Sequence, residues 1–121
     1  MPNRSQSPRT RRVADRIQVE LAEILTTKTE DPRLRVLSVT GADVSRDFSF
    51  ARVWISGALS KEDEPAVLKA LQHAAPYFRT LLAPRLKLRV VPELHFEIDR
   101  SIETGTRIEK LLRELNEPRD E

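Results

Sequence analysis

Arginine and lysine residues gather in two short stretches of the chain. The first basic cluster lies within residues 9–16 and consists of Arg9, Arg11, Arg12 and Arg16. The second basic cluster lies within residues 79–89 and consists of Arg79, Arg85, Lys87 and Arg89. Residues 1–16 carry a net charge of +4 and residues 79–89 another +4, whereas the whole chain carries only +2. Because these cations bind phosphate oxygens, their segregation predicts contact with RNA. The alternative is that they are solvated groups at helix ends.

The first basic cluster lies at the start of a predicted amphipathic helix over residues 10–25. An apolar stripe runs along this segment through Val13, Ile17, Leu21, Ile24 and Leu25. Arg9, Arg12 and Arg16 follow a second stripe, three and four residues apart. The dipole at a helix start favours anions and disfavours arginine. The arginines there therefore indicate a polyanionic ligand.

A proline interrupts the next helical pattern. Leu68 and Leu71 before Pro76, and Leu82 after it, keep helical spacing. Proline moves the preceding residue away from helical geometry and is tolerated at the first position of a helix. We therefore expect one helix to run from Pro65 to Ala74, an extended Ala75, and a second helix from Pro76. The predicted kink consists of Ala74, Ala75 and Pro76.

Three segments are predicted to form a small sheet. "VLSVTGADV" (36–44) and "FSFARVWIS" (48–56) read as an antiparallel hairpin, and "PELHFEID" (92–99) reads as a third strand. A last helix is predicted over residues 106–115, with a capping box at Thr106 and Glu109. This order predicts an α+β fold, with helices packed on one face of a three-stranded sheet.

The second predicted strand carries aromatic residues on the face that points away from the core. Ala51, Val53 and Ile55 alternate toward the core, which leaves Phe50 and Trp54 on the other face beside Arg52. Such rings stack on RNA bases in some proteins. The alternative function is a protein–protein interaction module that uses this Phe50/Trp54 sheet face.

Polar residues that could support catalysis or bind a metal are sparse. His95, Glu97 and Asp99 alternate on one strand face, which is also ordinary for a solvated strand. The chain has no cysteine and no phosphate-binding glycine loop, zinc-protease motif or nucleophile elbow. The sequence therefore predicts no catalytic residue, metal or cofactor, and hence no enzyme.

The order of elements and four stretches of sequence resemble a known family. The stretches are "DPRL" (31–34), "VSRDFSFARVW" (44–54), "ALQHAAPYFRTLL" (70–82) and "LRVVPELHFEIDRSIETGTRIEKLL" (88–112). Together they are similar to ribosome-binding factor A, a family with a type II KH arrangement of α-β-β-α-kink-α-β. The family bends its helix pair at an Ala-x-Gly kink, whereas this chain has Pro76 at the glycine position.

The resemblance implies a non-catalytic assembly factor. Such a factor binds the small ribosomal subunit and its rRNA late in maturation, takes part in rRNA processing and supports growth in the cold. Ribosomal proteins and an assembly GTPase are further implied partners. We expect a cytoplasmic monomer without a membrane span, composed of a flexible basic arm (1–8), a KH-like RNA-binding domain (9–116) and a polar tail (117–121).

Overall fold

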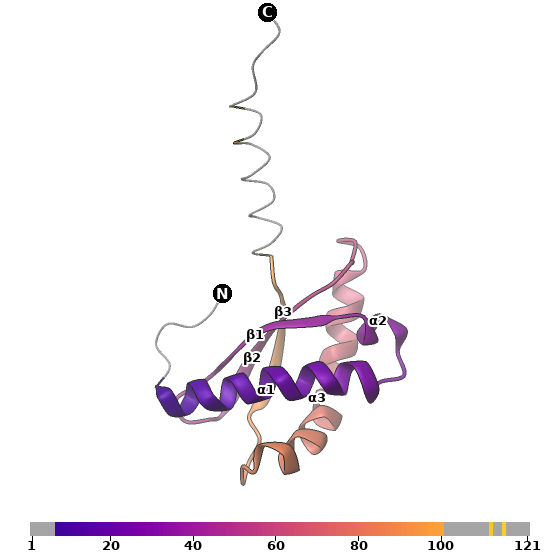
Figure 1. Cartoon of the computed structure of the whole chain (residues 1–121). Helices are drawn as coiled ribbons and strands as arrows, with labels where there is room; N and C mark the ends of the chain where they lie inside the picture. Colours follow the sequence, from indigo (N-terminus) through magenta and orange to yellow (C-terminus); the bar gives the residue numbers. More distant parts are fainter. Residues whose placement is uncertain (1–6, 101–111, 113–114, 116–121) are drawn as a thin grey trace, which may run out of the picture.

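The computed structural model describes residues 7–100 together with Leu112 and Leu115. Its elements are α1 (Pro8–Thr27), α2 (Pro32–Arg35), β1 (Ser38–Val44), β2 (Phe50–Ser56), α3 (Glu64–Leu86) and β3 (Glu93–Ile98). This α+β arrangement confirms the predicted first helix, hairpin and third strand (Figure 1). The short helix α2 was not predicted. The predicted helix over residues 106–115 lies outside the described residues, apart from Leu112 and Leu115.

Helix α1 begins earlier than its apolar pattern. Ser7 is the N-cap, and its hydroxyl oxygen accepts a hydrogen bond from the Thr10 backbone N–H at 3.2 Å. Pro8 occupies the first turn, where a backbone N–H would have no acceptor within the helix, so its lack of an N–H costs no hydrogen bond. The predicted stripe is buried from Ile17 to Leu25, while Val13 is only partly buried. Ser7 and Pro8, which we expected in the flexible arm, therefore belong to the start of α1.

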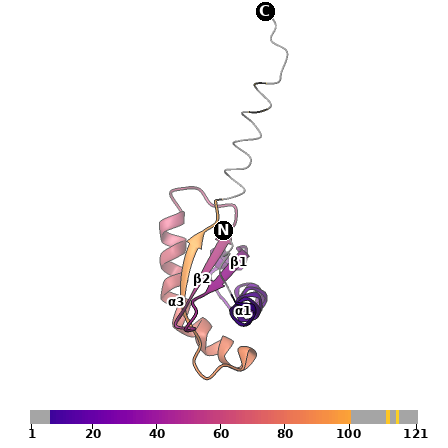
Figure 2. The same ribbon diagram turned by 90° about the vertical axis from the view of Figure 1, so that its left-hand side faces the viewer.

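The sheet has the order β1-β2-β3, with β1 and β2 antiparallel and β2 and β3 parallel. The central strand β2 buries Ala51, Val53 and Ile55 completely, as predicted. Helix α1 packs along β1 and α3 along β3, and the two helices also contact each other (Figures 1 and 2). One hydrophobic core therefore lies between the helices and one face of the sheet.

Helix α3 continues through Pro76, so the predicted break is wrong. A single helix spans Glu64–Leu86, and Ala75 is a buried residue within it. Its buried stripe crosses the proline without losing register, through Val67, Leu71, Ala75, Phe78 and Leu82. Burying the four large side chains of this stripe stabilises the fold by about 6–12 kcal/mol, which exceeds the cost of about 3 kcal/mol for an interior proline.

The axis of α3 nevertheless changes direction. Both views show the second half of the helix turning away from the line of the first half (Figures 1 and 2). Pro76 has no N–H to donate to the carbonyl of Gln72, and proline is the usual cause of such a bend. The kink residues Ala74, Ala75 and Pro76 thus bend one helix and do not separate two helices.

The third strand differs from its predicted alternation at one residue. His95 and Glu97 are exposed, as expected for a solvated face, but Asp99 is buried. The Asp99 carboxylate accepts a hydrogen bond of 2.6 Å from the Thr40 hydroxyl, beside the irregularity in β1. A threonine far away in the sequence therefore compensates for the burial of this acid.

Candidate nucleic-acid interface

Three segments that carry basic residues meet at one end of the molecule, which we call the basic end. They are the start of α1, the turn between β1 and β2, and the connection from α3 to β3 (Figure 1). The Arg9 guanidinium lies 4.9 Å above the Phe48 ring, which joins α1 to the turn. The Glu93 N–H donates to the Ser49 carbonyl at 3.0 Å, which joins the turn to the start of β3.

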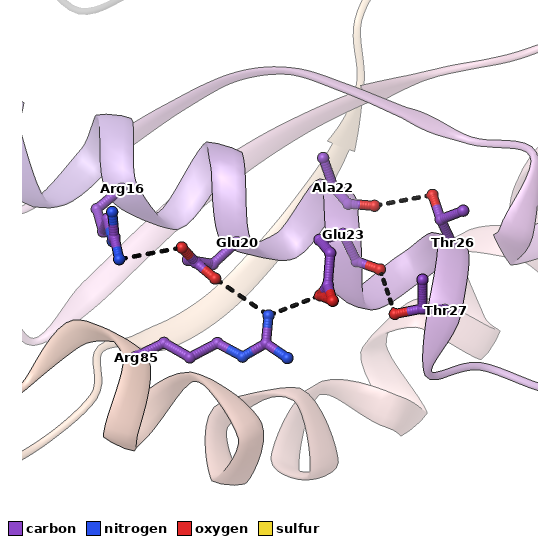
Figure 3. Close-up of polar contacts among 7 residues, drawn as sticks. All are labelled: Arg16, Glu20, Ala22, Glu23, Thr26, Thr27 and Arg85. Carbon is purple, nitrogen blue, oxygen red and sulfur yellow. Dashed lines mark hydrogen bonds and ion pairs between the residues drawn. The ribbon is translucent and has the colours of Figure 1, made fainter.

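The two basic clusters flank one contact line between helices, which we call the α1–α3 seam. Arg85 of α3 donates to Glu20 of α1 at 3.0 Å and to Glu23 at 2.6 Å (Figure 3). Arg16 lies one turn earlier on α1 and forms an ion pair of 3.3 Å with Glu20 (Figure 3). Farther along, the Tyr77 hydroxyl donates to the Lys28 carbonyl at 3.4 Å. Thus α1 and the second half of α3 run side by side in opposite directions.

The charges at the centre of the seam compensate one another. The hydrogen bond from Arg85 holds the pKa of Glu23 below its usual value of 4.5, although partial desolvation opposes this shift. The same two carboxylates, Glu23 and Glu20, raise the pKa of Arg85. Arg85 therefore cancels much of the negative charge of Glu20 and Glu23, which lie between the basic end and the rest of the seam.

Arg11 has a structural role at the outer edge of the sheet. Its terminal guanidinium nitrogen donates to the Ala42 carbonyl of β1 at 2.9 Å, and its Nε donates to Asp15 at 3.0 Å. Gln18, two turns later on α1, donates to the Val39 carbonyl at 3.3 Å. Side chains of α1 thus bind carbonyl groups of the edge strand β1.

Arg79 has the corresponding role at the opposite edge. It donates to the Val91 carbonyl at 2.7 Å, just before β3, and Gln72 donates to the Leu94 carbonyl at 2.9 Å. The Nε atom of Arg79 is buried and makes no hydrogen bond with the described residues. Because Arg11, Arg79 and Arg85 are all held in such contacts, we leave them out of the surface that we propose to meet RNA.

The other predicted cations are more accessible. Arg9, Arg12, Arg16, Lys87 and Arg89 are exposed. Within the described part of the chain, Arg12, Lys87 and Arg89 form no ion pair. Lys87 is the C-cap of α3 in a left-handed conformation, with φ of 56°, which turns the chain toward the basic end.

Arg46 is a further accessible cation that the sequence pattern did not predict. This exposed residue lies in the turn between β1 and β2, two residues before Phe48, which Arg9 contacts. Arg46 stands next to Asp47 in the sequence, so local charge density gave no signal. The feature that marks Arg46 is the packing of its hairpin turn against the start of the basic helix α1. This packing is visible only in the tertiary fold.

The remaining candidates are less distinctive. On the open sheet face, Phe50 is 40% exposed and makes an edge contact with His95 at 5.6 Å, while Trp54 is half-buried. Base stacking or protein binding by this face stays a prediction. Among the residues that the structure describes, no three histidine, cysteine, aspartate or glutamate side chains gather as a metal site. No helix in the same part of the chain is long and apolar enough to span a membrane.

Comparison with known proteins identifies the family. A family model described as ribosome-binding factor A matches residues 9–112. The chain belongs to the ribosome-binding factor A family. The Nitrosospira multiformis ribosome-binding factor A is 43% identical over 106 residues, covering 88% of this chain and 84% of that protein. The Thiobacillus denitrificans ribosome-binding factor A is 40% identical over 119 residues, covering 94% and 96%.

Solved structures of the ribosome-binding factor A family share the fold. The crystal structure of the factor from Thermus thermophilus has a TM-score of 0.66 at 29% identity, covering 76% of this chain and 98% of that one. A homology model of the Thermus thermophilus factor, fitted into a cryo-EM map of its complex with the 30S subunit, has a TM-score of 0.61 at 31% identity. It covers 72% of this chain and 91% of that one. These similarities and the order of the described elements confirm the predicted KH-like fold.

Proposed function

We propose that this protein is a ribosome assembly factor that binds the small ribosomal subunit through phosphates of its rRNA and catalyses no reaction. The observation that carries the proposal is the basic end, where exposed cations from three segments of the chain meet. A relative with the same fold has been fitted into a map of its complex with the 30S subunit, which supports this partner.

The proposed contact surface consists of residues that the fold leaves accessible. It comprises Arg9, Arg12, Arg16, Arg46, Lys87 and Arg89. Phosphate contacts of this kind position a protein on RNA without reading its sequence, so the shape of the subunit supplies the specificity. We further propose that the protein acts in the cytoplasm as a monomer during subunit maturation, where ribosomal proteins and an assembly GTPase are its additional partners.

Co-sedimentation with purified ribosomal subunits tests the proposal. The full chain should sediment with small subunits at low salt and be released as salt rises, because bound phosphates regain counterions. Large subunits are the control and should retain little protein. Equal retention by both subunits, or binding to small subunits that is insensitive to salt, would contradict the proposal.

A further inference from the structure

A cavity of about 580 Å³ opens between the α1–α2 connection and the middle of α3. Its apolar surface is formed by Leu34, Ala70, Ala74 and Phe78. Its polar lining comes from Lys28, Thr29, Glu30, Asp31, His73 and Tyr77. The volume lies within the range of pockets that hold small organic molecules. None of the residues proposed to contact phosphates lines this cavity.

Two alanines keep the cavity open. Ala70 and Ala74 lie four residues apart, so they share one face of α3, and both line the cavity. Both are partly buried and pack against the hydrophobic core. A larger side chain at either position would occupy the hollow, so the small residues give a flat ring access to the helix surface.

Aromatic and cationic side chains surround the opening. Tyr77 is 49% exposed, and His73 lies one turn before it on the same face and is also exposed. Lys69 lies a further turn toward the start of α3. Within the described residues, the ammonium groups of Lys69 and Lys28 make no ion pair. Tyrosine and histidine rings stack on unpaired bases in RNA complexes.

The polar lining suits the edge of a base. The Lys28 carbonyl already accepts a long hydrogen bond of 3.4 Å from the Tyr77 hydroxyl, which a ligand can replace. The Glu30 carboxylate forms no ion pair within the described structure, so its oxygens are available to accept hydrogen bonds from the amino group of a base. The Asp31 carboxylate is held by Arg33 at 2.7 Å, so it adds little uncompensated charge.

We propose that this cavity binds the base of an unpaired nucleotide in an RNA strand that follows the α1–α3 seam. The inference rests on the proposed RNA-binding function and adds a base subsite to it. Arg16 of the first basic cluster and Lys28 at the cavity are separated by just over three turns of α1, about 18 Å along the helix axis. Between them, Arg85 binds the carboxylates of Glu20 and Glu23. It thereby reduces the negative charge that would repel phosphates along the seam.

Tyr77 provides a direct reporter, because it is the only tyrosine and Trp54 is the only tryptophan. In a Trp54→Phe variant of the full chain, tyrosine emission comes from the cavity alone. A short single-stranded RNA should quench this emission, and an oligonucleotide of equal length and charge with abasic sites should not. The matched pair of substitutions is Ala74→Leu, which fills the cavity, and Ala66→Leu, which adds the same side chain at an exposed position of α3.

Ala74→Leu should weaken binding of the single-stranded RNA about tenfold and abolish the quenching, whereas Ala66→Leu should change neither. Circular dichroism should show that both variants remain folded; if Ala74→Leu does not, Tyr77→Ala takes its place in the affinity measurement. Equal quenching by the abasic strand, or unchanged affinity of the folded cavity variant, would overturn the proposal.

If RNA leaves the emission of Tyr77 unchanged while Ala74→Leu weakens binding to intact subunits, the proposal is also overturned, and the occupant of the cavity is a protein side chain. The Ala66→Leu variant distinguishes these results from a failure of the proposed function. If it sediments with small subunits, the proposed function holds, and a loss seen only with Ala74→Leu reports on the cavity.

Discussion

The guanidinium group of Arg85 lies 2.6 Å from the carboxylate of Glu23, and this contact joins the end of α3 to the second half of α1. It places the two basic clusters, far apart in the sequence, on either side of one helix seam. Arg85, which was predicted to contact RNA, is thereby held by two carboxylates, and its contact with RNA stays a prediction. It neutralises acids that would repel RNA at the centre of the proposed path.

Replacing Arg85 by methionine should weaken binding to small subunits about fivefold, because it leaves Glu23 without its ion pair and Glu20 paired with Arg16 alone, close to the phosphates. Adding Glu20→Gln and Glu23→Gln to this variant should restore most of the affinity. A titration of labelled protein with subunits would measure both effects. If the triple variant binds as weakly as Arg85→Met alone, Arg85 contacts RNA itself.

Removing two exposed cations from the basic end should reduce the salt dependence of binding. The Arg12→Ala/Arg89→Ala variant should lower the slope of log K against log salt by about 0.7–0.9 for each lost phosphate contact. The control variant, Arg35→Ala/Lys61→Ala, has the same change in charge but lies at the end of α2 and in the loop before α3. Equal loss of slope in both variants would indicate an effect of net charge alone.

Arg79→Met should destabilise the fold by about 1.5–3 kcal/mol, because it removes the hydrogen bond to the Val91 carbonyl and leaves this acceptor unpaired. Urea denaturation measures the change in the free energy of unfolding. Lys87→Met is the control, since this side chain is exposed and makes no described ion pair. A fully stable Arg79→Met variant with weakened subunit binding would return Arg79 to the RNA-contacting residues.

Pro76→Ala should increase the free energy of unfolding by about 1–3 kcal/mol, because alanine supplies the N–H donor that the Gln72 carbonyl lacks while the buried stripe of α3 keeps its register. Pro76→Gly, which introduces the residue of the family kink, should be less stable than Pro76→Ala because glycine loses more backbone entropy on folding. Chemical denaturation of the two variants provides the comparison. Destabilisation by alanine would show that core packing depends on the bend.

The contribution of Arg85 to stability should depend on pH. The folded-state pKa of Glu23 lies below its usual 4.5, so folding favours the ionised carboxylate. This contribution is complete above pH 4.5 and is lost as the pH falls through the lowered folded-state pKa. The difference in Tm between the wild type and Arg85→Met should therefore be present at neutral pH and shrink in acid. A difference that stays constant on acidification would mean that Arg85 stabilises by packing alone.

Elements with a regular apolar period could be predicted from the sequence. The stripe from Ile17 to Leu25 and the alternation of Ala51, Val53 and Ile55 are buried as expected. The predicted break at Pro76 is wrong because burial of the apolar residues on both sides of the proline outweighs the local tendency of proline to end a helix. The short helix α2 escaped notice because four residues show no period, although Asp31 caps it by accepting from the Arg33 N–H at 2.9 Å.

For the candidate site, the sequence predicted the two clusters of positive charge but not which of their side chains are accessible. Arg12 and Arg89 look no different in the sequence from Arg11 and Arg79, yet only the latter pair binds carbonyl groups at the sheet edges. That distinction depends on contacts between residues far apart in the chain. Arg46 and the cavity beside Tyr77 likewise exist only once the helices and the hairpin have packed.

The side chains that cover both edges of the sheet have a consequence for assembly. An uncovered edge strand offers a row of carbonyl and amide groups to which a strand of another chain can add, which leads to fibres or to mispaired dimers. In this protein Arg11 and Gln18 occupy carbonyls on one edge, and Gln72 and Arg79 occupy carbonyls on the other. These contacts therefore disfavour the addition of a strand from a second copy of the chain at either edge.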